Sequence, residues 1–399
     1  MTEQINTPEL RFPEFSYVWK STLLGDVSYI TKLAGFEFTK YVNYSNKGKV
    51  PAIRGLNVKN GRFNFKELKY IDDSDFSKLS RSKLLPKDIV FTYVGTIGNA
   101  AIVPNNTNWY LAPNVAKIRS TNVDPKFLLQ ILINPNFKRR EIFSWITTSS
   151  QPALSMSNIR NFKLYLPSIM EQEKLGEFFS KLDRQIELEE EKLELLEQQK
   201  KGYMQKIFSQ QLRFKDENGN DYPKWENKLL GNLVNITMGQ SPSSKNYTEN
   251  SNYTTLVQGN ADLNNGYIQP RIYTKQITKL AEVNDILLTV RAPVGKIGRA
   301  QLKACIGRGV CAIKGDSFIY YFLELFDLQN KWIRFSQGST FESISGNEIK
   351  NIDIAYPINE ERQKISEFLS KLDELLKNQL LKVEQLKQRK QGLLQKMFI

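Results

Sequence analysis

The stretch EFFSKLD at residues 177–183 recurs as EFLSKLD at residues 367–373. Around these heptapeptides, residues 159–208 align with residues 349–398 without a gap, and about 20 of roughly 50 positions are identical. An ungapped match of this length is far above chance. The chain of 399 residues therefore contains an internal duplication.

The duplication extends beyond this segment with small gaps. The further paired motifs are Leu10-Arg11-Phe12 with Leu212-Arg213-Phe214, Trp19 with Trp225, Leu24-Gly25 with Leu230-Gly231, Ile53-Arg54-Gly55 with Val257-Gln258-Gly259, and Gly95-Thr96-Ile97-Gly98 with Gly295-Lys296-Ile297-Gly298. The order is domain, helix, domain, helix, which we place at residues 1–167, 168–210, 211–357 and 358–399. The domains diverge while the helical parts stay similar. This pattern is expected if the two domains recognise different targets and the two similar helices pair with each other.

The repeated segments are predicted to be long helices. Each follows a proline, Pro167 or Pro357, and carries apolar residues at intervals of three or four, interrupted by polar residues such as Lys200 and Lys390. A helix of about 40 residues spans about 60 Å, and its apolar stripe needs a partner. We expect an antiparallel coiled coil; the alternative is that each helix packs separately on its own domain. The predicted seam consists of Leu182, Ile186, Leu193, Leu196, Tyr203, Ile207, Leu372, Leu376, Val383, Leu386, Leu393 and Met397.

The two domains are predicted to be mixed α/β. Strand-like runs bounded by Gly, Pro or Asn occupy residues 88–94, 100–103, 115–118, 285–290 and 310–313. Helical stretches are expected at residues 125–132 and 317–334. The predicted fold class is therefore α+β, with two pseudo-repeated α/β domains separated by two long, antiparallel helices.

The composition indicates a polyanionic partner. The formal net charge is +14, which favours nucleic acid; a basic surface without a binding role is the alternative. The polar N-terminus lacks the order of a signal peptide, and no apolar run approaches the roughly 20 residues of a membrane span. We therefore expect a cytoplasmic protein without a membrane partner, in which Cys305 and Cys311 are reduced.

Catalytic motifs are missing from the sequence. It contains no histidine, which excludes a Ser–His–Asp triad, a Cys–His pair and a histidine-ligated metal. It has no P-loop pattern, and no carboxylate–carboxylate–lysine cluster indicates Mg²⁺-dependent cleavage. Asn-Pro-Asn-Phe at residues 134–137 resembles the Asn-Pro-Pro-Phe loop of amino-methyltransferases, but a turn between helices is favoured. We predict no catalytic residue and no metal site.

Polar loops carry the candidate DNA contacts. Arginine can bind guanine through two hydrogen bonds, lysine and arginine neutralise phosphates, and Ser, Thr and Gln contact base edges without a charge. The candidates are Arg54, Tyr93, Thr96, Ser149, Gln151, Gln258, Arg291, Lys296, Arg299, Gln337, Ser339 and Thr340. For each of them, ordinary turn chemistry is the alternative. Basic clusters at residues 138–140 and at Lys331 and Arg334 are further candidates for phosphate contacts, or are solvated helix faces.

The chain resembles the specificity subunits of type I restriction–modification enzymes. The resemblance rests on the duplicated layout, on the SKLD-bearing helices, and on the junctions formed by Pro167 with Glu171-Gln172 and by Pro357 with Glu361-Arg362-Gln363. It covers essentially the whole chain, and the repeated helices are its most specific part.

The resemblance implies a function in DNA methylation and phage defence. Each domain would be a target-recognition domain that reads one half of an asymmetric, bipartite site in double-stranded DNA. The helices would set the spacer between the half-sites. Two methyltransferase subunits and two restriction/translocase subunits would join the chain, and S-adenosylmethionine, ATP and Mg²⁺ would belong to those partners.

Two other interpretations stay open on the sequence. One is a free-standing enzyme, such as a nuclease with an unrecognised carboxylate site. The other is an assembly scaffold whose charge only steers partners. The specificity subunit is preferred because it alone explains similar helices beside diverged domains.

Overall fold

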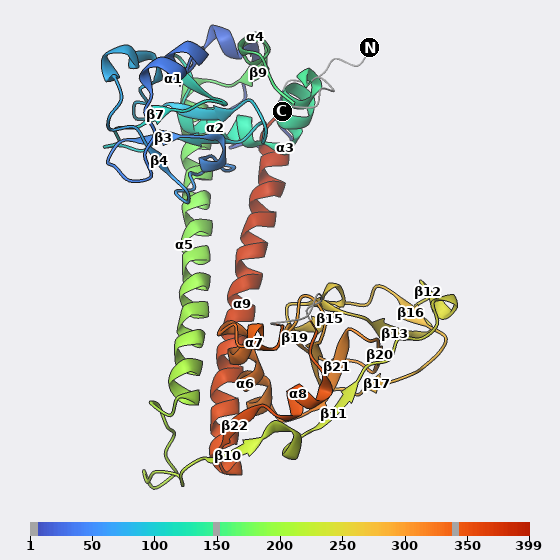
Figure 1. Ribbon diagram of the computed structural model, residues 1–399. Coiled ribbons are helices and arrows are strands. Elements are labelled where there is room, and N and C mark those ends of the chain that lie inside the picture. Colours follow the sequence, from blue (N-terminus) through green and yellow to red (C-terminus); the bar gives the residue numbers. More distant parts are fainter. Residues whose placement is uncertain (1–6, 147–151, 337–342) are drawn as a thin grey trace. The chain divides into compact units, whose positions relative to one another are not determined.

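The computed structural model describes residues 7–146, 152–336 and 343–399, and the chain divides into two units. Unit 1 consists of Met1–Glu191 and Leu381–Ile399, and unit 2 consists of Lys192–Leu380. Two long helices, α5 (Ile169–Phe208) and α9 (Asn359–Met397), each contribute one segment to each unit (Figure 1). The long helices predicted from the repeat are confirmed.

Unit 1 contains two larger sheets and a short strand pair. The orders are β2-β8-β5-β6, β4-β3-β7 and β1-β9. The strands are β1 (Lys20–Leu23), β2 (Ser28–Lys32), β3 (Pro51–Ile53), β4 (Lys69–Tyr70), β5 (Ile89–Thr92), β6 (Ala100–Ile102), β7 (Tyr110–Leu111), β8 (Val115–Ser120) and β9 (Lys163–Leu166). The short helices are α1 (Gly35–Tyr41), α2 (Pro125–Ile133), α3 (Pro135–Phe137) and α4 (Met156–Arg160).

Unit 2 repeats this plan with more strands. The orders are β11-β21-β18-β19-β15-β14, β12-β16-β13-β20-β17 and β10-β22. The strands are β10 (Glu226–Leu229), β11 (Asn235–Met238), β12 (Tyr247–Thr248), β13 (Thr254–Val257), β14 (Leu263–Asn264), β15 (Tyr267–Ile268), β16 (Tyr273–Thr274), β17 (Leu280–Ala281), β18 (Ile286–Thr289), β19 (Ile297–Arg299), β20 (Ala304–Ile306), β21 (Val310–Lys314) and β22 (Asp353–Tyr356). The short helices are α6 (Ser317–Leu328), α7 (Ile333–Ser336) and α8 (Gly346–Lys350).

The central strands of both units are buried on both faces. In β5, Ile89 and Phe91 belong to one apolar cluster, whereas Val90 between them belongs to the cluster on the other face. In β18, Leu288 and Leu287 divide in the same way. Successive side chains of a strand point to opposite faces, so a strand covered on both faces has a continuous apolar sequence. This is why the apolar runs predicted as strands were recognisable.

The predicted helix at residues 317–334 is wrong in its extent. Helix α6 starts at an Asp316 cap, whose Oδ1 accepts the Ile319 amide at 3.0 Å, and ends at Leu328. Asn330 then adopts a positive φ of 54°, which stops the helix before the short α7 begins. Trp332, in the intervening turn, is 4% exposed and packs on Phe326.

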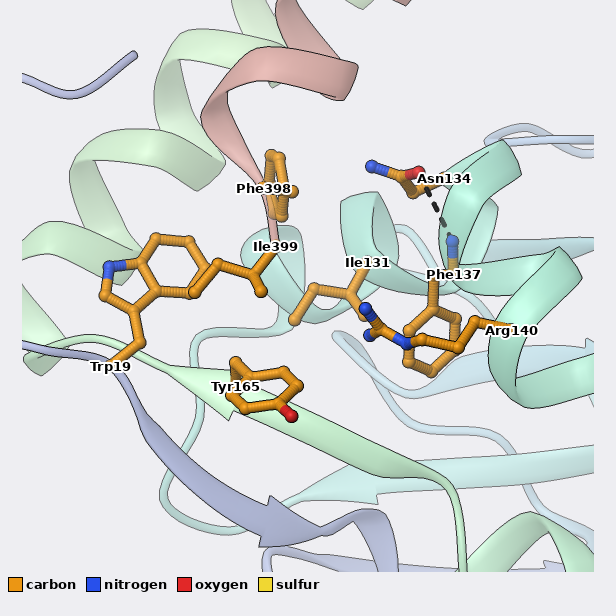
Figure 2. A pocket seen from close by; sticks show the side chains of 8 residues that line it. All are labelled: Trp19, Ile131, Asn134, Phe137, Arg140, Tyr165, Phe398 and Ile399. Carbon is orange, nitrogen blue, oxygen red and sulfur yellow. Dashed lines mark hydrogen bonds between the residues drawn. The ribbon is translucent and has the colours of Figure 1, made fainter. Parts of the chain in front are cut away.

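The end of α9 is part of the core of unit 1. Phe398 is 7% exposed and stacks on Phe127 of α2, with the rings 5.4 Å apart. Trp19 meets the same ring edge-on, and Ile399 lies beside it (Figure 2). In unit 2 the repeat counterpart Phe208, at the end of α5, packs on Phe318 of α6. The repeated Gln-Lys-x-Phe tails are therefore similar because each fills the core of one domain.

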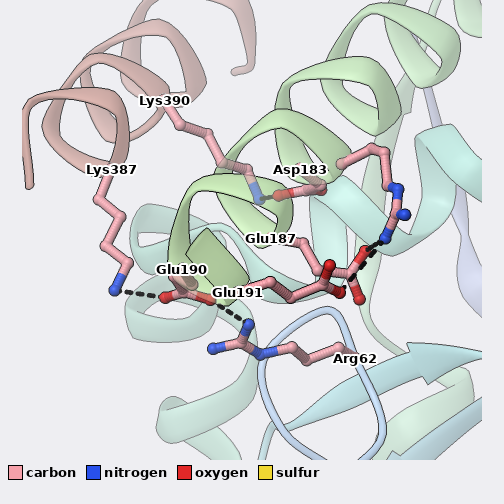
Figure 3. A network of polar contacts seen from close by, with 8 residues as sticks. Arg62, Asp183, Glu187, Glu190, Glu191, Lys387 and Lys390 are labelled. Carbon is pink, nitrogen blue, oxygen red and sulfur yellow. Dashed lines mark hydrogen bonds and ion pairs between the residues drawn. The ribbon is translucent and has the colours of Figure 1, made fainter. Parts of the chain in front are cut away.

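The segments of α5 and α9 run antiparallel within each unit. In unit 1, Lys390 Nζ lies 2.5 Å from Asp183 Oδ1, and Lys387 Nζ lies 2.6 Å from Glu190 Oε1 (Figure 3). Rising numbers on α5 thus meet falling numbers on α9. In unit 2, Lys200 pairs with Asp373, and Tyr203 meets Phe368 further back along α9.

Burial along the predicted seam is uneven. Four of its residues, Ile186, Ile207, Val383 and Met397, are less than 9% exposed. Tyr203 is 39% exposed, and the remaining seam positions are intermediate. Met204 and Leu394, which the stripe omitted, are buried against the domain cores. The apolar residues in the middle of each helix thus face the other helix, whereas those near the end pack on a domain core. The spacing of three or four residues does not distinguish these two kinds of contact.

Arginine–glutamate pairs attach a segment of each unit to the start of a long helix. Arg11 donates two hydrogen bonds to Glu171, at 2.7 and 2.6 Å, and Arg213 donates two to Glu361, at 2.8 and 2.7 Å. Both glutamates are at most 1% exposed. A buried carboxylate needs such a partner, and the two-pronged guanidinium geometry supplies it. The Leu-Arg-Phe repeat is thereby explained by structure.

Candidate nucleic-acid interface

The site in unit 2 begins at the carboxyl ends of two parallel strands, β13 and β20. Their register pairs Leu256 with Cys305 and Val257 with Ile306. The next residues are Gln258 on one side and Gly307-Arg308-Gly309 on the other. A Cβ on Gly309 would stand 2.1 Å from the Gln258 carbonyl oxygen, so only glycine allows the two segments to approach this closely. The approach places Arg308 beside Gln258.

A polar hollow lies at these strand ends. Its volume is about 230 Å³, several times that of a water molecule. It is lined by Ser241, Gln258, Gly259, Arg291, Ala292, Arg308 and Gly309. Ser241 Oγ accepts the Arg308 amide at 3.1 Å and thereby holds the turn.

The side chains of the hollow leave hydrogen-bond donors available. Arg291 and Arg308 are exposed, and among the described residues neither guanidinium has a hydrogen-bond or ion-pair partner. The Gln258 amide oxygen receives a 3.4 Å contact from the Tyr247 hydroxyl. Two free guanidinium groups next to an amide form a donor-rich surface, which suits an acceptor-rich or anionic ligand.

The same place in unit 1 has different chemistry. Strands β3 and β7 are also parallel, with Ile53 opposite Leu111, so Arg54 corresponds to Gln258 and Pro113 corresponds to Arg308. Arg54 is partly buried, and its guanidinium donates to the Glu67 carbonyl. At the two equivalent positions, unit 1 therefore has a hydrogen-bonded arginine and a proline, whereas unit 2 has a glutamine and an arginine whose guanidinium has no partner among the described residues.

The predicted match between the two Gly-x-x-Gly turns is wrong. Thr92 Oγ1 accepts the Asn99 amide at 2.9 Å, and Thr289 Oγ1 accepts the Lys296 amide at 2.9 Å, so Asn99 and Lys296 are equivalent. The strand registers agree, because Phe91 pairs with Ala100 as Leu288 pairs with Ile297. Gly98 thus corresponds to Gly295, and both have positive φ, at 86° and 90°. In this register Val94 corresponds to Arg291.

The remaining candidates in the Gly-x-x-Gly turns lie apart from the hollow. Lys296 Nζ is 3.0 Å from Asp327, and Arg299 stacks on Tyr320 at 4.7 Å while donating to Ser317. Thr96 is exposed, whereas Tyr93 is only 8% exposed and belongs to the core of unit 1. Ser149, Gln151, Gln337, Ser339 and Thr340 lie outside the described residues.

The sequence pattern did not indicate Arg308 as a candidate DNA contact. Strand β20 has three residues, Ala304–Ile306, too few for its pattern to indicate a strand. The available signal was Gly307-Arg308-Gly309 between the two cysteines, since an arginine between two glycines suggests a close backbone approach that exposes the side chain.

The basic clusters are held by local contacts. Lys138 Nζ donates to Asn60 Oδ1 at 2.7 Å, and burial lowers the pKa of this ammonium to about 8. Arg140 pairs with Glu141 at 3.0 Å. Lys331 and Arg334 lie over the Phe326 ring. These charged groups therefore already have hydrogen-bond, ion-pair or ring contacts with neighbouring residues of the chain.

A second, apolar hollow in unit 1 has a volume of only about 10 Å³ (Figure 2). It lies between Trp19, Asn134 and Phe398 and is about the size needed for one water molecule, so it is a packing gap rather than a ligand site. Asn134 of the Asn-Pro-Asn-Phe motif caps the next turn with its side-chain oxygen and donates to the Leu394 carbonyl. The motif is thus a structural turn.

The described residues contain neither a helix that could span a membrane nor a cluster of metal ligands. No helix in residues 7–146, 152–336 and 343–399 is long and apolar enough to cross a membrane. Within the same ranges, no group of three or more acidic or cysteine side chains is arranged to hold a metal ion.

Comparisons with known proteins agree on one family. A family model described as the type I restriction modification DNA specificity domain matches residues 18–198 and again residues 222–385. The putative type I restriction enzyme MjaX specificity subunit of Methanocaldococcus jannaschii is 28% identical over 372 residues, covering 88% of this chain and 87% of that protein. The MjaVIII specificity subunit of the same organism is 23% identical and covers 96% of this chain and 92% of its own length.

Solved structures show the same fold. The crystal structure of a type I restriction–modification system S subunit from M. genitalium superposes with a TM-score of 0.62 at 16% identity, covering 98% of this chain and 99% of that one. A structure from a study of complex assembly in a type I restriction–modification system superposes with a TM-score of 0.57 at 23% identity and the same coverage. With the specificity domain matched twice, the chain belongs to the family of type I restriction–modification DNA specificity subunits.

Proposed function

We propose that the chain is the DNA-reading subunit of a type I restriction–modification complex. Unit 1 and unit 2 each read one half of an asymmetric, bipartite site in double-stranded DNA, and the chain itself carries out no catalysis. The observation that carries this proposal is that one scaffold occurs twice with different side chains at two equivalent positions, Arg54 and Pro113 in unit 1 against Gln258 and Arg308 in unit 2.

The charge of the chain supports DNA as the ligand. A net charge of +14 provides long-range attraction to phosphates, but this attraction carries no sequence information. Sequence is read by hydrogen-bond donors and acceptors that reach base edges. The free donors of Arg291 and Arg308 in unit 2 are suited to that role.

The long helices support a spacer-setting role. Helix α5 has 40 residues and α9 has 39, and each belongs partly to unit 1 and partly to unit 2. A helix is stiff over such a length, whereas a flexible linker would let the spacing vary. The domain boundaries that we propose are residues 1–167, 168–210, 211–357 and 358–399.

Catalysis and cofactors are assigned to other subunits. We propose that two methyltransferase subunits dock on the chain and methylate adenines with S-adenosylmethionine. Two restriction/translocase subunits using ATP and Mg²⁺ complete the complex in the cytoplasm. Of the described apolar residues on the repeated helices, Leu188, Leu195, Leu375 and Leu381 are 45–58% exposed and are available to such partners.

The experiment is co-expression with the adenine methyltransferase encoded beside this chain, followed by mapping of methylated adenines on plasmid DNA by single-molecule sequencing. We expect methylation confined to a split, asymmetric motif, one half of which changes when either domain is exchanged. Methylation without a motif would instead favour a scaffold, and DNA cleavage by the purified chain with Mg²⁺ alone would favour a free-standing nuclease.

A further inference from the structure

The hollow in unit 2 is a built feature of the fold. Gly309 allows backbone contact with Gln258, and a Cβ on Gly307 would stand only 3.1 Å from Ser241 Oγ and 3.3 Å from Gln258. The Ser241 hydroxyl holds the Arg308 amide, so the turn between the glycines is fixed. The direction in which Arg308 leaves the backbone is therefore set by the fold.

The donors of the hollow match the edge of one base in particular. Gln258 presents an amide, and the two arginines present only donors. In the major groove guanine offers two adjacent acceptors, N7 and O6, and arginine is the side chain that meets both at once. Adenine, by contrast, offers one acceptor and one donor there, and arginine cannot accept from that donor.

A phosphate contact accounts less well for the differences between the units. Phosphates are present at every DNA sequence, so residues that bind them have no reason to differ between two copies of one scaffold. Here the three equivalent positions are Gln258, Arg291 and Arg308 in unit 2, but Arg54, Val94 and Pro113 in unit 1. The strands that carry these residues keep the same register in both units. A kept strand register with different polar groups at the strand ends is the pattern expected of base reading.

We propose that Arg308, supported by Gln258, reads a guanine through its N7 and O6 in the half-site bound by unit 2, with Arg291 at the rim of the same hollow. Positions 54 and 113 occupy the corresponding place in unit 1 and read a different base. This inference rests on the proposed function, because it names the residues that distinguish one half-site from the other.

The test compares Arg308→Ala and Arg308→Lys with the wild type in the methylation-mapping assay. Arg308→Lys keeps the charge but loses the two-pronged donor geometry. We expect both variants to lose preference for one G·C pair by about tenfold or more, in the half of the motif that follows unit 2 in domain exchange. The half that follows unit 1 should not change. Lys303→Ala is the control, since Lys303 is an exposed cation of the same unit that precedes β20, does not line the hollow and pairs with Glu282 at 2.8 Å.

Different outcomes separate the two proposals. A wild-type motif that survives both substitutions, with methylation uniformly weakened by Arg308→Ala but not by Arg308→Lys, would identify a phosphate contact and overturn the base-reading role. A wild-type half-site without a fixed guanine would also overturn it. If the wild type itself produces no motif, the proposed function fails and this inference fails with it.

Discussion

Lys200 Nζ lies 2.6 Å from Asp373 Oδ1 in unit 2, and Lys390 Nζ lies 2.5 Å from Asp183 Oδ1 in unit 1. These are the same two repeat positions with the helices exchanged, because Lys390 is the copy of Lys200 and Asp373 is the copy of Asp183. Duplication has therefore produced one ion pair twice, once between each pair of antiparallel helix segments. The polar residues that interrupt the apolar stripe are explained by this pairing.

The two copies differ in their third partner. In unit 2, Lys200 also lies 2.8 Å from Glu324 of α6, whose pKa is raised by burial. Burial lowers the pKa of Lys200, but attraction from Glu324 and Asp373 outweighs it and the pKa is raised overall. Each aspartate also accepts one hydrogen bond from its own domain, Asp373 from the Tyr321 hydroxyl at 2.7 Å and Asp183 from the Gln130 amide at 2.9 Å. Lys200 therefore balances two carboxylates and Lys390 balances one.

Lys200→Met should lower the free energy of unfolding by about 3 kcal/mol, because Lys200 is only 9% exposed and its loss leaves two partly exposed carboxylates without their shared partner. Lys390→Met should lower it by less, about 1–3 kcal/mol. Urea unfolding followed by circular dichroism measures both. The loss for Lys200→Met should shrink in mild acid as Glu324 takes up a proton. Equal losses, or a loss independent of pH, would show that Glu324 is not part of the network.

Trp225→Phe should cost more than Trp19→Phe. Trp225 Nε1 donates to Glu361 at 2.8 Å, whereas Trp19 Nε1 is buried without a partner among the described residues. Both substitutions remove a similar volume from a similar core, so the difference isolates a hydrogen bond to a carboxylate, about 1.5–3 kcal/mol. Unfolding free energies of the two variants, measured side by side, provide the test. A larger loss for Trp19→Phe would contradict it.

Gly295→Ala should be strongly destabilising. Its φ is 90°, and a Cβ would stand 2.1 Å from Cδ1 of Trp332, which is itself buried. Gly98→Ala is the matched control, because Gly98 has a similar φ of 86° but its nearest neighbour, Ile142, would be 3.6 Å away. The control should cost about 1 kcal/mol for backbone strain alone, and Gly295→Ala at least about 2 kcal/mol more. Similar melting temperatures for the two variants would refute this account.

Lys138 should make stability depend on pH in the alkaline range. Its pKa in the folded chain is about 8, below the ordinary value of 10.5, because burial disfavours the charged form. Between these values the unfolded chain binds more protons, so the free energy of unfolding rises with pH. Relative to Lys138→Gln, the wild type should gain stability from about pH 8 to about pH 10.5. Urea unfolding at several pH values measures this gain, and a constant difference would exclude Lys138 as its source.

The sequence by itself determined the duplication, the long helices, the main apolar strands and the family. Each follows from a local or periodic signal: matched motifs such as Leu-Arg-Phe, apolar residues at intervals of three or four, and continuous apolar runs. The absence of histidine was equally decisive in excluding classes of catalysis. A class of catalysis can be excluded without a structure when the residue type that it requires is missing.

Only the tertiary structure decided which residues share a surface. Arg308 and Gln258 are 50 positions apart in sequence and become neighbours because β13 and β20 pair in parallel, a long-range contact with no local signature. The motif match paired Gly98 with Gly298, whereas the strand registers show that Gly98 corresponds to Gly295. Similar tetrapeptides can occupy different positions along equivalent strands. The register is set by hydrogen bonds between strands that are distant in sequence, so it cannot be inferred from the order of residues along the chain.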